Sequence, residues 1–424
     1  MTARGGAGIE WTRRLDAEID ALAPLLRSLR RELHAHPEPS GQELLTTAKL
    51  ETLLAERGLS SRRGPQGLGL LVDSPEPVDG PRVALRADLD ALRLQDGKAV
   101  DYRSQVDGVM HACGHDAHTA CGLGAALALA RLAAEGALPW PVPWRAVFQP
   151  AEETASGAYD MIEGGALDGV AAIFALHVDP SRPVGQVGVR DGAFTASCDW
   201  LEIVVRGQGG HAARPHESVD PIVAATQLIG ALYAFVPRAV DSQEPAVLTI
   251  GRIQGGYSAN VIPDQVELSG TLRTLSPAVR ERVKQRIREL AHGLEQASGA
   301  QISVEFRRGL AGVYNDAAAT AVVRRAARDA LGPENVVEIP RPSMGGEDFA
   351  GYLERIPGAM FRLGVRSDRV GKEPLHSPLF DIDEAALAWG AKILARALIL
   401  WAGETGKGDG KDRVPFESDA DARR

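Results

Sequence analysis

The chain has 424 residues, of which 44% are hydrophobic and 24% charged, and its formal net charge at pH 7 is -9. This length exceeds what a single hydrophobic core usually spans, so we expect two domains. The composition is typical of a globular protein, and the acidic balance argues against nucleic acid or an anionic membrane surface as the main partner.

The sequence predicts neither export nor membrane insertion. Residues 1–8 lack the basic-then-apolar pattern of a secretory signal, and no apolar run is expected to approach the length of a membrane span. The three cysteines do not make a disulfide framework, because two of them fall in one polar cluster. We therefore expect a protein of the reducing cytoplasm.

The first half of the chain alternates predicted helices and strands. Apolar residues recur at steps of four and three over 15–33, which predicts an amphipathic helix, and 123–134 is apolar enough for a buried helix. Apolar runs at 82–91, 144–153 and 170–178 predict strands, so the order indicates an α/β fold with a mostly parallel sheet covered by helices on both faces. Ligands bind beyond the carboxyl ends of such strands, where this chain places Asp88, Asp90, Glu152, Glu153 and His177.

From about residue 195 the pattern changes to that of a smaller domain. Helices are predicted at 220–236, with Asp220 as N-cap, and from Ser276 onward. With strands at 200–207, 246–253, 266–275 and 301–306, the order becomes β-α-β-β-α-β, typical of a two-layer α+β domain.

The simplest organisation is a catalytic domain in two pieces with a second domain inserted. We expect the first catalytic part at 1–194, an inserted lid and dimerisation domain at 195–309, and the second catalytic part at 310–402. Residues 403–424 are rich in glycine and charge, which predicts a disordered tail.

The stretch MHACGHDAHTAC, residues 110–121, holds three of the ten histidines and two of the three cysteines. In one interpretation, the histidines lie at helical spacing and form only ordinary hydrogen bonds with neighbouring residues, although Gly114 counts against a continuous helix. In a second, Cys113 is a nucleophile paired with a histidine. In a third, Cys113 and His115 are alternate residues of a tight turn and face one zinc-like metal ion.

The adjacent Glu152 and Glu153 favour the metal interpretation. Two neighbouring carboxylates repel each other, and a nearby cation keeps both ionised. One carboxylate then binds metal while the other is free to accept a proton; an exposed acidic pair is the alternative. His177 at the end of an apolar strand and His376 in PLHSPLF are weak signals taken singly.

Eight motifs, taken in order, resemble those of the aminoacylase and carboxypeptidase family of two-metal hydrolases: RADLDAL, GVMHACGHDAHTA, FQPAEE, ALHV, GGHAARPH, ANVIPD, GGEDFAGY and LHSPLFDIDE. They span about residues 29–398 and are most similar to the branch of hippurate hydrolases and N-acyl-amino-acid amidohydrolases, which includes the plant indoleacetyl-amino-acid hydrolases. The series is specific for the family and much less so for the substrate, because Leu92-Arg93 stands where the branch usually has Leu-Pro.

The resemblance implies two divalent metal ions in each subunit. Manganese or zinc fits the ligand types best, and cobalt or nickel also suits them. Cys113 would bridge the ions, His115 and Glu153 would complete one of them, and His177 and His376 the other.

The resemblance also implies the reaction. Glu152 would act as general base on a water shared by the ions, which attacks the amide bond of a small N-acyl amino acid and releases a carboxylic acid and a free amino acid. Asp90 and Asp116 would orient the ligands. A dipeptidase or carboxypeptidase of the same family is the alternative activity, and a binding protein or a structural zinc protein fits less well because Glu152 is present and the ligands are scattered.

Three further residues are assigned by the resemblance alone. His211 would reach into the site of a neighbouring subunit and donate to the oxyanion, so a homodimer or a dimer-based oligomer is expected. Asn260 and Arg273 would bind the substrate carboxylate.

Overall fold

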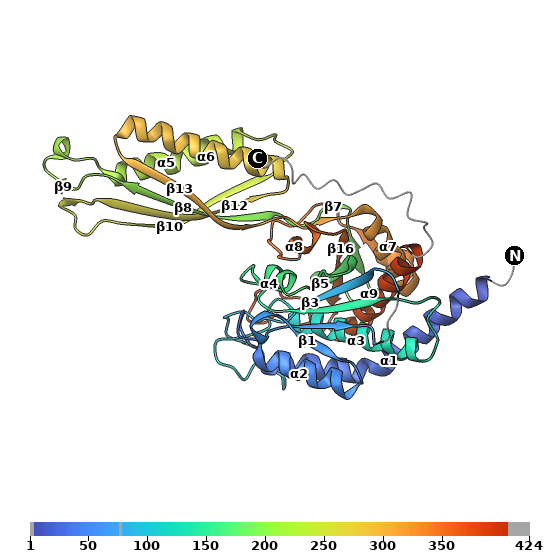
Figure 1. Ribbon diagram of the computed structural model, residues 1–424. Coiled ribbons are helices and arrows are strands. Elements are labelled where there is room, and N and C mark those ends of the chain that lie inside the picture. Colours follow the sequence, from blue (N-terminus) through green and yellow to red (C-terminus); the bar gives the residue numbers. More distant parts are fainter. Residues whose placement is uncertain (1–3, 76–78, 406–424) are drawn as a thin grey trace.

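The computed structural model describes residues 4–75 and 79–405, which form two units joined side by side (Figure 1). The larger unit is built on an eight-stranded sheet of order β1-β2-β4-β3-β5-β16-β6-β15. Its four central strands run parallel: β4 (Trp144–Gln149), β3 (Arg82–Asp88), β5 (Val170–Pro183) and β16 (Gly358–Arg366). The outer strands are β1 (Ser61–Arg63), β2 (Leu70–Asp73), β6 (Val187–Val189) and β15 (Val336–Glu338).

Helices cover both faces of this sheet. The main hydrophobic core joins one face to α1 (Arg4–Ala35), α2 (Leu44–Glu56), α3 (His115–Ala134), α7 (Ala317–Leu331) and α9 (Ala385–Thr405). A smaller core lies between the opposite face and the short helices α4 (Gly157–Glu163) and α8 (Ala350–Leu353). The predicted α/β fold class is therefore confirmed.

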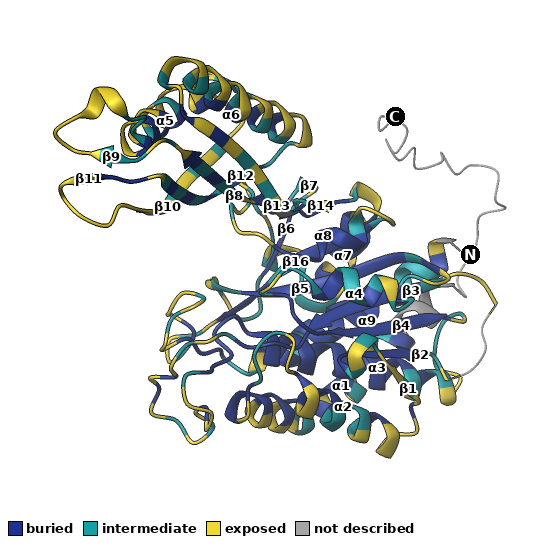
Figure 2. Ribbon diagram, turned by 60° about the vertical axis from the view of Figure 1, so that its left-hand side comes forward, coloured by how far each residue is buried: buried dark blue, intermediate teal, exposed yellow. Residues whose placement is uncertain are grey.

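The second unit contains a four-stranded antiparallel sheet of order β10-β12-β8-β13. Its strands are β8 (Ser197–Arg206), β10 (Ala246–Gly255), β12 (Gln265–Thr274) and β13 (Gln301–Leu310). Helices α5 (Pro221–Phe235) and α6 (Pro277–Ser298) pack on one face and keep their outer sides exposed (Figure 2). The expected order β-α-β-β-α-β is present in these long elements, and Asp220 and Ser276 cap the two helices.

Short two-stranded pairs complete the architecture. β9 (Gly210–His211) pairs with β11 (Val261–Ile262) at the far end of the second unit (Figure 1). β7 (Gly192–Ala193) pairs with β14 (Tyr314–Asn315) near the passage between the two units.

Three sequence-based expectations need correction. The strand expected to end at residue 178 continues to Pro183, because β5 keeps pairing with β16 as far as the pair Arg366 and Pro183. Residues 403–405, which were expected in a disordered tail, belong to α9, and residues 406–424, where the rest of that tail was expected, lie outside the described part of the chain. The expectation that no apolar run approaches a membrane span was also wrong.

Two helices are long and apolar enough to cross a membrane by composition alone, namely His115–Ala134 and Ala385–Glu404. In the fold, 78% and 67% of their apolar windows are buried inside the protein. Both helices contribute to the main core, which accounts for their apolar composition.

One buried cation ties the helical layer together. The Arg30 guanidinium on α1 is fully buried and lies 2.9 Å from Asp116 of α3 and 2.7 Å from Asp381, which precedes α9. Because charges taken out of water require a partner, this contact fixes three distant segments at once.

Replacing Arg30 with alanine should lower the free energy of unfolding by about 3–5 kcal/mol, because Asp116 and Asp381 would stay buried without their cation. Denaturant unfolding of the metal-free protein measures the effect. Arg14→Ala is the matched control, since Arg14 pairs with Glu135 at the surface and its loss should cost below about 1 kcal/mol. Equal losses in the two variants would contradict the role given to Arg30.

Candidate metal centre

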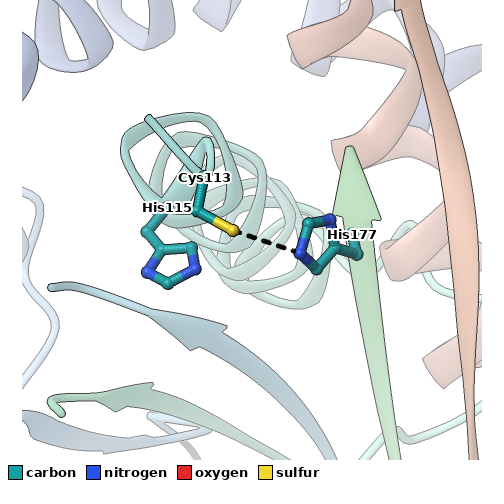
Figure 3. A group of neighbouring side chains, drawn as sticks. All are labelled: Cys113, His115 and His177. Atoms are coloured by element: carbon teal, nitrogen blue, oxygen red, sulfur yellow. Dashed lines mark hydrogen bonds between the residues drawn. The ribbon is translucent and has the colours of Figure 1, made fainter. Parts of the chain in front are cut away.

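Cys113 and His115 lie at the start of α3, at the carboxyl end of the parallel sheet (Figure 3). Gly114 between them is the N-cap residue and has a left-handed φ of 89°. A Cβ at Gly114 would lie 2.4 Å from a methyl group of Val178, so the turn needs glycine both for its φ and for its close approach to β5. The Cys113 sulfur consequently lies 3.6 Å from Nε2 of His177.

The two histidine rings are oriented by hydrogen bonds on their Nδ1 atoms. His115 Nδ1 lies 2.9 Å from the carbonyl oxygen of Asp90 and 3.1 Å from its carboxylate, and His177 Nδ1 lies 2.8 Å from the carbonyl of Val178. Each Nδ1 therefore carries the proton and donates it, so each Nε2 has a lone pair that can bind a metal ion, and the lone pair of His177 accepts from the Cys113 thiol in this structure. Such partners are typical of metal-binding histidines.

A strained turn after β4 presents the two glutamates. Ala151 and Ala155 have positive φ values of 54° and 59°. A Cβ at Gly157 would lie 1.6 Å from the carbonyl oxygen of Pro150, so this position also needs glycine. The Glu153 amide donates to the Asp90 carboxylate over 3.0 Å. Backbone strain of this kind persists only where the surrounding structure enforces it, and it concentrates at functional sites.

His376 comes from the loop before α9 and also has a positive φ, 64°. Its amide donates to the Ala112 carbonyl over 2.8 Å, which anchors the loop beside Cys113. The His376 Nε2 lies 3.5 Å from Oε1 of Glu153. Residues from four separate segments thus meet at one point.

Two of the possible ligand groups share one cysteine. Cys113, His115 and His177 form one group, and Cys113, Glu153 and His376 form the other, with ligand atoms within 4.8 Å of one another in each. His115, Glu152 and Glu153 form a further group, which is compatible with the expected pairing of His115 with Glu153. The division of the ligands between two ions therefore stays a prediction.

The donor set fits divalent cations. His115 Nε2 and Glu153 Oε1 are buried and have no hydrogen-bond partner among the described residues. Burial raises the pKa of the Cys113 thiol, so the thiolate needs a nearby cation to form. Thiolate, imidazole and carboxylate are ligands that zinc-like ions accept. A cysteine that belongs to two such groups can be shared by two ions.

Glu152 stands beside these ligands with a different environment. Its Oε1 accepts a 3.3 Å hydrogen bond from the Asp348 amide, and its Oε2 lies 3.9 Å from His115 Nε2. Burial, followed by the charges of Glu347 and Asp348, raises the Glu152 pKa well above its usual range. A raised pKa allows a carboxylate to hold and release a proton near neutral pH.

A cavity of about 690 Å³ opens over the centre and is lined by both units. The larger unit contributes Glu152 and four of the expected ligands, Cys113, Glu153, His177 and His376, and the second unit contributes Cys198, Trp200 and Arg273. Arg273 Nη1 donates to the carbonyl of Met344 over 2.8 Å, which places its guanidinium at the junction of the two units.

Of the remaining expected site residues, only Asp90 contacts a residue of the ligand groups. Asp90 contacts His115 as expected, whereas Asp116 turns toward α1, where it lies 2.7 Å from His34 and 2.9 Å from Arg30. His211 and Asn260 are exposed and neighbour each other at the β9–β11 end, and neither lines the cavity of its own chain.

Several supporting residues received no role from the sequence, although Asp88 was placed at the end of its strand. Asp88 accepts from His118 Nδ1 over 2.6 Å, and His118 Nε2 accepts the Val178 amide next to His177. On the other side of Asp88, the buried Arg86 pairs with Asp88, Glu347 and Asp348. The motifs RADLDAL and GGEDFAGY contain four of these residues, so their place in the series was the available signal.

Glu43 was missed as well, and it holds the glutamate turn. Its Oε1 accepts the amides of Gly41 and Ala151, over 3.0 and 2.8 Å, and its Oε2 is buried without a partner among the described residues. Burial, together with the charge of Asp90, raises the Glu43 pKa from 4.5 to about 7.

Fold and site together define a hydrolase of amide or peptide bonds that uses two divalent metal ions. The chain belongs to the peptidase family M20/M25/M40, whose model matches residues 84–400. It is 43% identical over 377 residues to an N-acetylcysteine deacetylase of Bacillus subtilis, covering 88% of this chain and 96% of that protein. It is 36% identical over 382 residues to the IAA-amino acid hydrolase ILR1-like 2 of Arabidopsis thaliana, covering 89% and 85%.

A solved structure shares the whole architecture. The YXEP protein of Bacillus subtilis, a dinuclear metal-binding peptidase of the M20 family, superposes with a TM-score of 0.78 at 38% identity. The match covers 90% of this chain and 99% of that one. The expected family is therefore confirmed.

The buried Glu43 predicts a pH dependence of stability. Between about pH 4.5 and pH 7 the folded protein keeps a proton that the unfolded chain releases, so stability falls as the pH rises through this window, by at most about 3 kcal/mol. Glu43→Gln keeps an acceptor oxygen for both amides and should remove this part of the dependence. Denaturant unfolding of metal-free protein at about pH 5 and about pH 7.5 measures it.

The control for Glu43 is Glu38→Gln, because Glu38 also accepts amides of α2, those of Leu45 and Thr46. This variant should keep the pH dependence of the wild type. Parallel stability profiles for wild type and Glu43→Gln would show that Glu43 is already ionised in the folded protein.

Proposed function

We propose that the protein hydrolyses the amide bond of small N-acyl amino acids of the hippurate type. The observation that carries this proposal is Glu152, a buried carboxylate that lines the cavity directly beside the ligands and has its own hydrogen bond from the Asp348 amide. A carboxylate left outside the ligand groups is free to move protons during hydrolysis.

Cys113, His115 and His177 would hold one cation, and Cys113, Glu153 and His376 the other. Two divalent cations supply acidification of water and polarisation of a carbonyl group when bound. We propose manganese or zinc as the native ions, with cobalt or nickel as functional substitutes, because all four accept sulfur, nitrogen and oxygen ligands.

Glu152 accepts the proton of the attacking water and returns it to the leaving nitrogen, so that a carboxylic acid and a free amino acid result. Arg273 would bind the α-carboxylate, and its position in the lining of the cavity supports this role. Asn260 lies outside the cavity of its own chain, so its contribution depends on a second subunit.

His211 would donate a hydrogen bond to the oxyanion in the site of a second subunit. Its exposed position at the far end of β9 supports this arrangement, since a single chain keeps it away from the cavity (Figure 1). We accordingly propose a homodimer whose contacts involve the inserted domain, residues 195–309. A reducing cytoplasmic location agrees with three free, buried cysteines.

A carboxypeptidase or dipeptidase activity is the second candidate, favoured by the peptidase name of the structural relative. Assaying hippurate and N-acetyl amino acids beside dipeptides on metal-reconstituted protein separates the two. Preferential cleavage of dipeptides would replace the amidohydrolase proposal.

Replacing Glu152 with glutamine should lower kcat by about 10²–10⁴-fold, because the base loses its charge and keeps its shape. Metal content, measured by plasma mass spectrometry, should stay at the wild-type level. Glu153→Gln is the matched control and should lose metal. Loss of metal from Glu152→Gln would instead assign Glu152 as a ligand.

A mixing experiment tests the role of His211. Glu152→Gln and His211→Ala should each be inactive, and subunit exchange should restore up to about a quarter of wild-type activity, because mixed dimers assemble one intact site. Glu152→Gln mixed with His177→Ala should recover nothing, since both residues belong to one chain's own site. If the first mixture also stays inactive, His211 does not act across subunits.

A further inference from the structure

A second, smaller pocket opens beside the metal centre. Its volume is about 280 Å³, and it shares Ser343, Arg362 and Leu375 with the main cavity. Leu375 directly precedes the ligand His376, and Arg362 pairs in register with the ligand His177 across β5 and β16. Because paired residues of neighbouring strands point to the same face, Arg362 emerges next to His177.

The Arg362 side chain is held in place and remains available. Its guanidinium lies over the ring of the buried Phe194, 5.2 Å from the centroid. Among the described residues, none forms a hydrogen bond or an ion pair with it, and the charges of Asp179 and Glu347 act on it without direct contact. A guanidinium that stacks by its face keeps the N–H groups at its edge free to donate.

The other charges of this pocket leave it positive. Its lining contains three arginines, and the one carboxylate, Asp179, is 2.9 Å from Arg182 and neutralises it. Arg341 stands exposed at the pocket wall and pairs with no carboxylate of the described residues. Three arginines and one carboxylate give the lining an excess of positive charge, which favours a bound anion in this pocket.

We propose that this side pocket is an anion-binding subsite for a second carboxylate of the substrate, contacted by Arg362 and Arg341. The proposal rests on the amidohydrolase function and narrows it to dianionic N-acyl amino acids. The second carboxylate belongs either to the amino-acid side chain or to the acyl group. A guanidinium binds a carboxylate through two parallel hydrogen bonds, so an uncharged amide of the same shape should bind much less tightly.

Two substrate pairs that differ only in charge test the subsite. N-acetyl-glutamate beside N-acetyl-glutamine carries the carboxylate on the amino-acid side chain, and N-succinyl-leucine beside its terminal amide carries it on the acyl group. Calorimetry on metal-loaded Glu152→Gln protein measures binding without turnover. We expect the charged member of one pair to bind about tenfold to a hundredfold more tightly.

Adding Arg362→Gln should bring this affinity ratio close to one, and adding Arg341→Gln should reduce it severalfold. Arg341 is exposed, so its variant keeps the test valid if Arg362→Gln fails to fold, which circular dichroism reveals. Arg366→Gln is the matched control, because it removes the same charge from the exposed end of the same strand and should leave the ratio unchanged. Equal affinities within both pairs, or a ratio that survives both variants, would overturn the subsite.

Turnover separates this proposal from the one on which it rests. If the protein with Glu152 intact hydrolyses none of these four compounds, the amidohydrolase function is rejected. The ratio of affinities from calorimetry would still report on anion binding in the pocket. If Arg362→Gln lowers kcat/KM equally for both members of a pair, Arg362 has a general effect on the metal centre. That result would contradict the proposed subsite.

Discussion

The central constraint on this structure is that several electron-pair donors lie close together at the carboxyl end of one parallel sheet. A thiol, three imidazole nitrogens and a carboxylate from four segments point into one small volume, and two of these atoms are buried without a partner among the described residues. Such a cluster is unfavourable in an apolar surrounding unless cations bind to it. Metal binding and folding of this region are therefore coupled, since the site exists only when all four segments are in place.

Behind the centre, two buried arginines perform the same electrostatic task with permanent charge. Arg30 neutralises Asp116 and Asp381, and Arg86 neutralises Asp88 and its acidic neighbours. Burial alone would raise the pKa of Asp116, but the charge of Arg30 together with the charge and hydrogen bond of His34 outweighs burial and lowers this pKa. The pKa values of Asp88 and Asp381 are lowered as well, which favours the ionised form of all three carboxylates, and Asp88 holds the His118 ring that supports β5.

The sequence predicted the features that depend on local motifs and on the order of elements. It did not predict contacts between side chains that are distant along the chain. The ordered motifs identified the family, and alternating elements gave the parallel sheet. The approach of His376 to Cys113 depends on how the His376 loop returns to Ala112, which no spacing encodes. Glu43 acts 108 residues away from Ala151 and lies in an ordinary helical start, so its role needed coordinates. Arg362 left one signal, a charge inside the apolar strand Gly358–Arg366.

The two units contribute different residues to the metal centre and its cavity. The larger unit contains all members of the possible ligand groups, and hydrogen bonds to Asp90 and Asp348 of the same unit hold His115, Glu153 and Glu152. The second unit approaches this centre through Cys198, Trp200 and Arg273, none of which belongs to a ligand group. Under the proposed function, substitutions on β8 and β12 would change substrate selection while the chemistry stays constant. This separation explains why the motifs around Cys113 identify the family and leave the acyl group and the amino-acid side chain undetermined.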